Sequence, residues 1–219
     1  VHNFEQRFFY FIYFCISTTL NNQIKFCLQT DYLSLVKIMI DPKAIFSIKS
    51  DAQFEALALE VFRFQFENNS VYRSFCDLLY KHPSDIKTIE GIPFLPIQFF
   101  KSHDILSSND AIEKTFTSSG TTGSVTSKHL VTDLNQYKAS YTKGFQSFYG
   151  NVEDYVILAL LPSYLERDGS SLIYMVNDLI QQSNHPESGF YLNNLDELAQ
   201  KLLRLEAKKQ KTLLIGVSF

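Results

Sequence analysis

One stretch of the chain has the composition of an anion-binding loop. The run TFTSSGTTGSVTSK, Thr115 to Lys128, combines serine, threonine and glycine residues and contains no carboxylate. Its two SSGTTG glycines permit positive φ angles, so successive backbone N–H groups can point towards one anion. The hydroxyl groups add donors and the lysine adds a positive charge. These residue types suit phosphate, and the candidate phosphate-binding residues are Ser118, Ser119, Gly120, Thr121, Thr122, Gly123 and Lys128.

The same composition is also typical of a flexible Ser/Gly linker. Against a linker, the run lies between two strand-like segments, Thr115–Thr117 and His129–Val131, in a region that otherwise has the pattern of a folded domain. Two well-known phosphate loops do not fit this spacing. A Walker A loop has glycine directly before its lysine, whereas Ser127 precedes Lys128, and no GxGxxG opens a helix after a strand.

Few other residues have types that suggest chemistry. Arg167 and Asp168, within LERDGSS, are candidates for a loop near a nucleotide or simply surface charges. Cys76 lies at a core position of a helical pattern, which indicates packing and not nucleophilic chemistry. His129 adjoins the loop, where it either touches phosphate or is solvated at the end of a strand. The remaining histidines are scattered and predict no metal site: His2, His82, His103 and His185.

The residues before the loop predict helices. Ser50 and Gln53 form a plausible capping box, and apolar residues then recur at helical spacing. A second helical pattern covers Tyr72–Leu79. Two prolines within Gly91–Leu106 exclude a regular helix there and indicate an extended segment. We therefore expect residues 39–110 to be a helical N-terminal region.

After the loop, strand patterns alternate with helical patterns. DYVILALLP, Asp154 to Pro162, is a continuous apolar run typical of a strand buried on both faces. TLLIGVSF, Thr212 to Phe219, has the same pattern and predicts an internal strand. The alternation predicts an α/β fold with a partly parallel sheet over residues 111–219. Because nothing follows to cover the last strand, we expect this α/β core to be truncated at its C-terminus.

The first 38 residues lack such periodicity. RFFYFIYFCI, Arg7 to Ile16, is too short to span a bilayer, and no small-residue cleavage site follows it. We expect residues 1–38 to be a non-native leader or a disordered segment, with membrane insertion or export as the alternative.

The composition is that of a soluble globular protein, with 45% hydrophobic and 20% charged residues. A formal charge of -3 provides no basic field, so we expect no nucleic-acid partner. The three cysteines have no metal-like spacing and indicate a reducing, cytoplasmic location. The 20 phenylalanines suit an acyl pocket and an ordinary core equally well.

The SSGTTG core resembles the phosphate loop of the adenylate-forming enzymes, which include acyl-CoA synthetases and phenylacetate-CoA ligases. Three segments in this order and spacing resemble the acyl-protein synthetase (LuxE-type) branch of that superfamily: PFLPIQFFKS, FTSSGTTGS and LLPSYLERDGSSLIYMV. The resemblance covers about Ile40 to Phe219. It implies an adenylate-forming fold and a reaction of a long-chain fatty acid with ATP and Mg²⁺. The acyl-adenylate would then pass its acyl group to a protein cysteine, and in luminescent systems onward to a reductase.

The resemblance also assigns roles to residues. Ser118 to Gly123 would hold the β- and γ-phosphates of ATP, whereas Lys128 lies later after the last glycine than the lysine of the superfamily. Pro162, Ser163 and Tyr164 resemble the segment that lines the acyl-adenylate pocket. The acyl-accepting cysteine and the catalytic lysine would lie beyond Phe219, so we expect this chain alone to be inactive. The alternatives are a ligase that delivers the acyl group to coenzyme A and a non-catalytic nucleotide-binding module.

Overall fold

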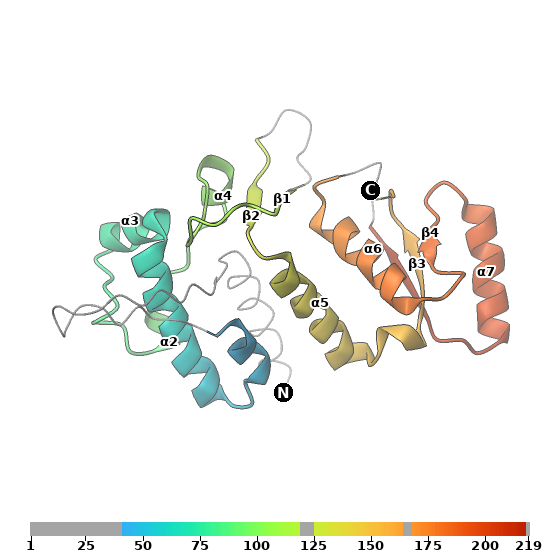
Figure 1. Cartoon of the computed structure of the whole chain (residues 1–219), viewed down its shortest axis with the longest axis horizontal. Coiled ribbons are helices and arrows are strands. Elements are labelled where there is room, and N and C mark those ends of the chain that lie inside the picture. The colour runs from blue at the N-terminus through green and yellow to red at the C-terminus, as the bar shows by residue number, and fades with distance from the viewer. Residues whose placement is uncertain (1–40, 119–124, 164–167, 218–219) are drawn as a thin grey trace. The chain divides into compact units, whose positions relative to one another are not determined.

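A computed structural model describes residues 41–118, 125–163 and 168–217 (Figure 1). The described chain divides into two compact units. The first unit contains residues 41–115 and 125–136, and the second contains residues 116–118, 137–163 and 168–217. The alternation of helices with small sheets is that of an α/β protein, as predicted.

The first unit is mainly helical, as the sequence predicts for this part of the chain. Its elements are η1 (Pro42–Ser47), α2 (Asp51–Asn68), α3 (Ser70–Leu78), η2 (Ile89–Gly91), α4 (Phe99–Ser102) and β2 (Lys128–Val131).

The predicted cap of α2 is present in a modified form. The Ser50 hydroxyl accepts a hydrogen bond from the backbone N–H of Gln53, as expected of an N-cap residue. The Gln53 side chain accepts from the N–H of Lys49 at 2.8 Å, so it does not close a capping box on Ser50 itself. Asn69 ends α2 and caps α3 by accepting from the N–H of Tyr72 at 3.0 Å. One residue therefore ends the first helix and starts the second.

The core of the first unit is the interface between α2, α3 and the proline-containing segment. The Tyr72 hydroxyl donates to the carbonyl of Pro93 at 2.6 Å and so fixes that segment against α3. The prediction of an extended segment is correct only up to Pro96. The short helix α4 follows, because both prolines precede its first turn and therefore remove no helical N–H. The buried core residues are Ala58, Phe62, Phe66, Tyr72, Cys76, Ile86 and Ile92.

Two short strands enclose the Ser/Gly/Thr-rich run. Strand β1 (Lys114–Thr117) and strand β2 form a two-stranded sheet of their own. Both predicted strand segments are therefore confirmed. Residues 119–124 lie outside the described residues.

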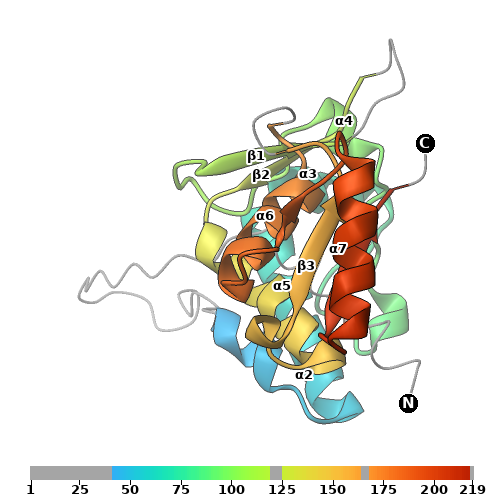
Figure 2. The same cartoon turned by 90° about the vertical axis from the view of Figure 1, so that its right-hand side faces the viewer.

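The second unit contains a three-stranded parallel sheet with strand order β4-β3-β5. Helices alternate with the strands along the chain, and Figure 2 shows β3 between α6 and α7. Its elements are the greater part of α5 (Leu134–Tyr149), then η3 (Val152–Asp154), β3 (Val156–Leu160), α6 (Ser171–Ser183), β4 (Gly189–Phe190), α7 (Leu195–Ala207) and β5 (Thr212–Gly216).

Strand β3 is the centre of this unit and is buried on both faces, as its continuous apolar pattern predicts. Ile157 packs with residues of α5 and α6 on one face. Leu158 packs with Leu198 and Leu205 of α7 on the other face. The helices therefore cover opposite faces of the sheet, as in a doubly wound α/β arrangement.

The strand predicted within Thr212 to Phe219 is confirmed as β5, whereas an internal position is not seen among the described residues. There, β5 pairs with β3 alone and lies at the edge of the sheet. Leu214 is 49% exposed and Val217 is 41% exposed. An apolar run predicts burial of side chains, but it does not determine whether a second strand pairs with the far edge.

Candidate functional site

The last residues of β1 are held by an aromatic cluster in the second unit. The Phe116 side chain is 3% exposed, and its ring centroid lies 5.1 Å from that of Tyr137 and 5.5 Å from that of Tyr174. These distances are typical of favourable aromatic pairs. We call Phe116, Tyr137 and Tyr174 the ring cluster. It fixes the point from which the chain enters the Ser/Gly/Thr-rich run.

Directly after the ring cluster, Thr117 is bound to the LERDGSS segment. The N–H of Thr117 donates to the carbonyl of Gly169 at 2.8 Å. Gly169 has φ +89°, and a Cβ atom placed on it would lie 3.1 Å from the Thr117 side-chain oxygen. Only glycine fits at residue 169 without strain. Residues with a side chain disfavour this positive φ, and their Cβ would lie too close to Thr117. We call this contact between Thr117 and Gly169 the loop base.

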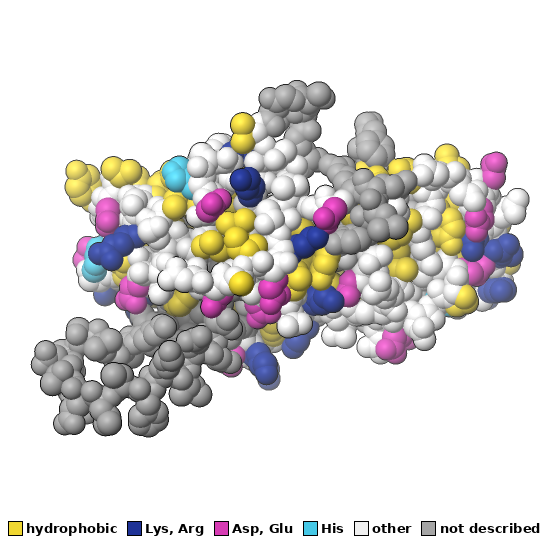
Figure 3. Space-filling view, turned by 45° about the horizontal axis from the view of Figure 1, so that its top comes forward, with side chains coloured by type: hydrophobic (Ala, Val, Ile, Leu, Met, Phe, Trp, Pro, Cys, Tyr) yellow, Lys and Arg dark blue, Asp and Glu magenta, His cyan; other side chains and the backbone are white. Residues whose placement is uncertain are grey.

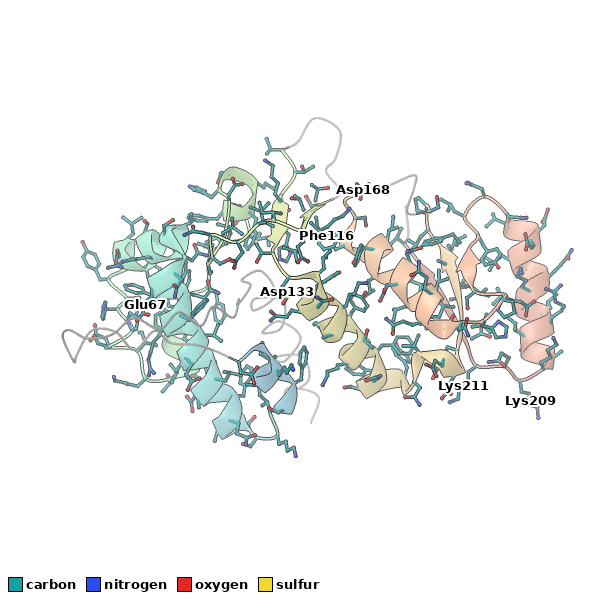
Figure 4. The ribbon with its side chains drawn as sticks, viewed as in Figure 1. Glu67, Phe116, Asp133, Asp168, Lys209 and Lys211 are labelled. Atoms are coloured by element: carbon teal, nitrogen blue, oxygen red, sulfur yellow. The ribbon has the colours of Figure 1, made fainter. Side chains whose placement is uncertain are left out.

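Asp168 lies beside the loop base. Its Oδ1 accepts a hydrogen bond from the N–H of Gly169 at 2.8 Å, and its side chain is exposed. Figure 4 shows Asp168 at the end of the second unit that also carries Phe116. Its exposure fits the interpretation of Asp168 as a surface charge, and a role near a nucleotide stays a prediction. Arg167 lies outside the described residues.

A helix N-terminus adjoins the loop base. Ser170 caps α6 by accepting from the N–H of Ile173, and the Tyr137 hydroxyl donates to the carbonyl of Ser171 at 3.1 Å. The N-terminus of a helix carries a partial positive charge and unpaired N–H groups, both of which favour an anion. The chain thus leaves Thr117 next to the N-terminus of α6, with the Asp168 carboxylate close by.

The same end of α6 lies at the carboxyl edge of the parallel sheet. Leu172, in the first turn of α6, packs in one cluster with Ala159 and Leu161 at the end of β3. Pro162 and Ser163 follow directly and are half-buried. Tyr164, the third predicted pocket residue, lies outside the described residues. The loop base and the described part of the predicted acyl pocket therefore belong to one edge of the sheet.

The connections of the sheet make this edge a natural ligand site. From β3 the chain passes through α6 to β4 on one side, and then through α7 to β5 on the other side of β3. The strand order therefore reverses between β3 and β5, whose ends meet at the pair Leu160 and Gly216. Open α/β sheets bind their ligands outside the carboxyl ends of strands at such a reversal.

Lys128 and the residues of β2 belong to the first unit. Lys128 begins β2 and is exposed. His129 is half-buried with its ring 6.3 Å from that of Phe100, and burial lowers the pKa of the imidazole to about 4. It is therefore neutral at pH 7, and the reading of a solvated histidine at a strand end is wrong because the ring packs against α4. Of the candidate phosphate ligands, Ser118 and Lys128 are described, and Ser119 to Gly123 are not.

Cys76 has the environment of a packing residue, as predicted. It is fully buried within the core of the first unit, and burial raises the pKa of its thiol to about 11. A thiol that stays protonated is a poor nucleophile. Cys15 and Cys27 lie outside the described residues. Among residues 41–118, 125–163 and 168–217 there is no group of three metal-ligating side chains.

A polar network that the sequence did not predict joins α5 to α6. The carboxylate of Asp178 accepts from the Tyr141 hydroxyl at 2.5 Å and from the Gln182 amide at 2.6 Å. Lys138 forms an ion pair with it at 3.3 Å, and this carboxylate raises the pKa of the lysine. The network fixes the helix whose N-terminus adjoins the loop base. Tyr137 and Tyr141 are four residues apart in α5, and this spacing is the sequence signal that would have placed both on one face of the helix.

The charged side chains give no single sign to the visible surface. Figure 3 shows lysine and arginine side chains interspersed with aspartate and glutamate side chains on the face that it draws. Within the described residues, no helix is both long enough and apolar enough to cross a membrane.

Comparison with known proteins gives one family and one relative. The family model described as "Acyl-protein synthetase, LuxE" matches residues 10–161, well over half of the chain. The long-chain-fatty-acid–luciferin-component ligase of Photorhabdus luminescens is 40% identical over 68 residues, which are 31% of this chain and 58% of the relative. No solved structure matches.

The matched range differs from the expected one at both ends. It begins at residue 10, inside the segment interpreted as a leader, and ends at residue 161, whereas the expected resemblance ran from about Ile40 to Phe219. The assignment of residues 1–38 to a leader stays a prediction. The chain spans 58% of the length of the relative that it matches.

Proposed function

We propose, given that this chain belongs to the acyl-protein synthetase family LuxE, that the protein activates a long-chain fatty acid with ATP and transfers the acyl group to a protein thiol. The name of the Photorhabdus luminescens relative supports the substrate class, because it describes a ligase for long-chain fatty acids. The proposed fold is the adenylate-forming type, and the proposed location is the cytoplasm.

One observation supports the nucleotide part of this proposal most directly. The N–H of Thr117 is bonded to Gly169 at the start of α6, so the Ser/Gly/Thr-rich run leaves β1 next to a helix N-terminus. Backbone N–H groups, hydroxyl groups and a helix N-terminus together suit the charge of a polyphosphate. The residue types of this run and the adjacent helix N-terminus are therefore the support for proposing ATP as the nucleotide.

In the proposed first reaction, a carboxylate oxygen of the fatty acid attacks the α-phosphorus of ATP. The bond from this phosphorus to the bridging oxygen breaks, and pyrophosphate leaves with the electron pair. Ser118 to Gly123 would donate hydrogen bonds to the β- and γ-phosphates, with Lys128 as a candidate positive charge. Fixed donors at a leaving group lower the barrier, because they stabilise charge that develops in the transition state. Mg²⁺ would enter with the nucleotide and neutralise phosphate charge.

The acyl chain would occupy the carboxyl edge of the sheet. Pro162 and Ser163 follow β3 at the strand-order reversal, where ligands of α/β sheets bind, and Tyr164 is the next residue in the sequence. The acyl-adenylate formed there would be attacked at its carbonyl carbon by a cysteine thiolate. AMP would leave with the electrons of the broken acyl–phosphate bond, and the acyl group would remain as a thioester. An acyl-accepting or reductase protein is the proposed partner.

The test of adenylation is acid-dependent exchange of labelled pyrophosphate into ATP. The protein would be expressed from its complete reading frame and assayed with fatty acids of several chain lengths. Thr121→Ala and Thr122→Ala remove two of the proposed donors, and we expect each to lower the exchange rate about 10²-fold or more. Thr88→Ala is the matched control. It removes the same atoms from an exposed threonine whose side chain makes no helix-capping bond.

The outcomes separate the alternatives. Exchange that requires a fatty acid and falls in the two loop variants, but not in Thr88→Ala, supports the proposal. ATP binding without exchange by the folded protein would indicate a non-catalytic nucleotide-binding module. The acceptor is identified by trapping the product. Acyl label on the protein that neutral hydroxylamine releases indicates a protein thioester, whereas acyl-coenzyme A as product indicates the alternative ligase.

A further inference from the structure

We propose that an exposed apolar surface of the first unit binds the surface of an anionic lipid bilayer. It consists of Leu78, Leu79 and Tyr80 at the end of α3 and of Ile97 in the turn before α4. We call these four residues the apolar patch. The proposal goes beyond the proposed function and does not depend on it, because the patch lies outside the candidate site.

The apolar patch presents large hydrophobic side chains to solvent. Tyr80 is 94% exposed, Leu78 is 78% exposed and Ile97 is 66% exposed. Figure 3 shows hydrophobic side chains gathered at the α3 end of the first unit. Neighbouring exposed apolar side chains with polar residues around them mark a surface that binds either a protein or a membrane.

A ring contact holds the two parts of the apolar patch together. The ring centroids of Phe75 in α3 and Phe99 in α4 lie 5.6 Å apart. Leu78 and Leu79 lie three and four residues after Phe75, so they share its side of the helix. Ile97 lies two residues before Phe99. The exposed side chains therefore flank one pair of half-buried rings.

The backbone at Tyr80 gives a second, independent indication. Helix α3 ends in a Schellman arrangement, in which the N–H of Tyr80 donates to the carbonyl of Asp77 at 3.1 Å and that of Lys81 donates to Cys76 at 2.9 Å. Tyr80 has φ +53° at the position that glycine usually occupies. This φ disfavours a residue with a Cβ, and the exposed phenol gains no burial to offset that cost. The folded state therefore does not account for a tyrosine here.

The charges around the apolar patch favour an anionic lipid surface as the partner. Residues 70–83 and 91–103 contain three cations, Arg73, Lys81 and Lys101, and one carboxylate, Asp77, although the whole chain has a formal charge of -3. Asp77 lies 3.9 Å from Arg73, which leaves the two exposed lysines to set the local charge. Apolar side chains beside lysines suit the headgroup region of an anionic bilayer, and a tyrosine suits its boundary between apolar and wet layers.

The first measurement is flotation of the protein, expressed from its complete reading frame, with lipid vesicles. The vesicles contain phosphatidylcholine alone or phosphatidylcholine mixed with anionic phosphatidylglycerol. We expect binding to the mixed vesicles at low ionic strength, and weaker binding as salt is added, because salt screens the attraction. Folded protein that floats with neither kind of vesicle would overturn the proposal.

Tyr80→Gly is the most informative variant, because it removes the phenol and suits the left-handed backbone. We expect it to resist urea at least as well as the wild type and to bind the mixed vesicles about 3- to 10-fold more weakly. Lys209→Gly is the matched control. Lys209 is exposed, has φ +53° and follows the end of α7 in the same type of cap. It also carries a positive charge, so equal loss of binding in both variants would indicate unspecific attraction and overturn the proposal.

A second pair of variants tests the apolar contribution at another residue. Leu78 and Leu203 are both exposed helical leucines, at 78% and 68%, but Leu203 belongs to α7 in the second unit. We expect Leu78→Ser to weaken binding several-fold and Leu203→Ser to leave it unchanged. Lys81→Gln and Lys101→Gln should each weaken binding to the mixed vesicles about 5-fold. Equal effects of the two leucine variants would contradict the proposal.

Sedimentation velocity without lipid separates a lipid-binding surface from a contact between protein copies. A wild-type dimer that Tyr80→Gly converts to a monomer would assign the apolar patch to self-association and overturn the proposal. The same oligomeric state in both proteins, with weaker vesicle binding of the variant, supports it. These measurements use neither ATP nor fatty acid, so their outcome is distinct from that of the adenylation test.

Discussion

The hydrogen bond between Tyr141 and Asp178 should contribute measurably to the stability of the second unit. The Tyr141 hydroxyl donates to Oδ2 of Asp178 at 2.5 Å, and the Asp178 side chain is only 16% exposed. Burial and this bond both raise the pKa of the Tyr141 phenol, so the phenol remains a donor at neutral pH. A bond to a charged acceptor is stronger than one to a neutral acceptor.

The magnitude follows from the nature of the acceptor. Tyr141→Phe removes one hydroxyl and leaves the ring in place, so it should cost about 1.5–3 kcal/mol of unfolding free energy. Tyr155→Phe is the matched control, because its hydroxyl donates at 2.9 Å to a neutral backbone carbonyl, that of Tyr149. This control should cost only about 0.5–1.5 kcal/mol. The expected difference reflects both the charged acceptor and the greater burial of Tyr141, and the double-mutant cycle separates the contribution of the carboxylate.

The assay is urea unfolding of the two variants, of Asp178→Asn and of the double variant Tyr141→Phe/Asp178→Asn. We expect Asp178→Asn to cost more than Tyr141→Phe, because Gln182 and Lys138 also interact with the carboxylate. The double-mutant cycle should give a coupling energy of about 1–3 kcal/mol. A coupling below about 0.5 kcal/mol would lie within ordinary additivity and would refute the reasoning.

Two other properties of the first unit are open to direct measurement. Burial lowers the pKa of His129 from 6.5 to about 4, so its neutral form is favoured in the folded state. The associated stability is present above pH 6.5 and is lost as the pH falls towards 4, by about 1–3 kcal/mol, and His129→Gln should remove this slope in urea titrations at several pH values. The thiol of Cys76, fully buried and with a pKa of about 11, should resist alkylation at pH 8 until the protein is unfolded, and rapid native labelling of its peptide by mass spectrometry would contradict that account.

Much of the local structure was predictable because local signals determine it. The Ser50 cap marks the start of α2, and the uninterrupted apolar run of β3 marks a strand buried on both faces. The alternation after residue 111 indicates an α/β fold. These features depend on residues close together in the sequence, and the periodicity of side chains is sufficient to identify them.

The arrangement of these elements was less predictable. The sequence indicated one α/β core from residue 111 onward, but β1 and β2 form a sheet separate from that of β3. Strand β5 is an edge strand in the described sheet, although its apolar run resembles that of β3. Strand pairing depends on long-range contacts, which periodicity does not encode.

The candidate site was predicted in part for the same reason. The residue types proposed the loop and the LERDGSS segment as candidates, and the assignment of the loop to phosphate binding stays a prediction; in the structure Asp168 lies at the loop base. The contact that brings these segments together joins Thr117 to Gly169, and no local pattern predicts such a pair. The only sequence signal for Gly169 is its place in an Asp-Gly dipeptide, which indicates a turn but not the neighbour of that turn.

The order of the strands also has a consequence for how the protein folds during synthesis. Val156 of β3 pairs with Thr212 of β5, so 56 further residues (212 − 156) must be made before the central strand can acquire that neighbour. At about 5–20 residues per second, the ribosome needs roughly 3–11 s to make them. For most of this interval the apolar VILAL segment lacks part of its final cover, since α7 is made only near its end and β5 after it. Until its distant partner is made, the central parallel strand exposes apolar surface, which makes this the most aggregation-prone stage of its synthesis.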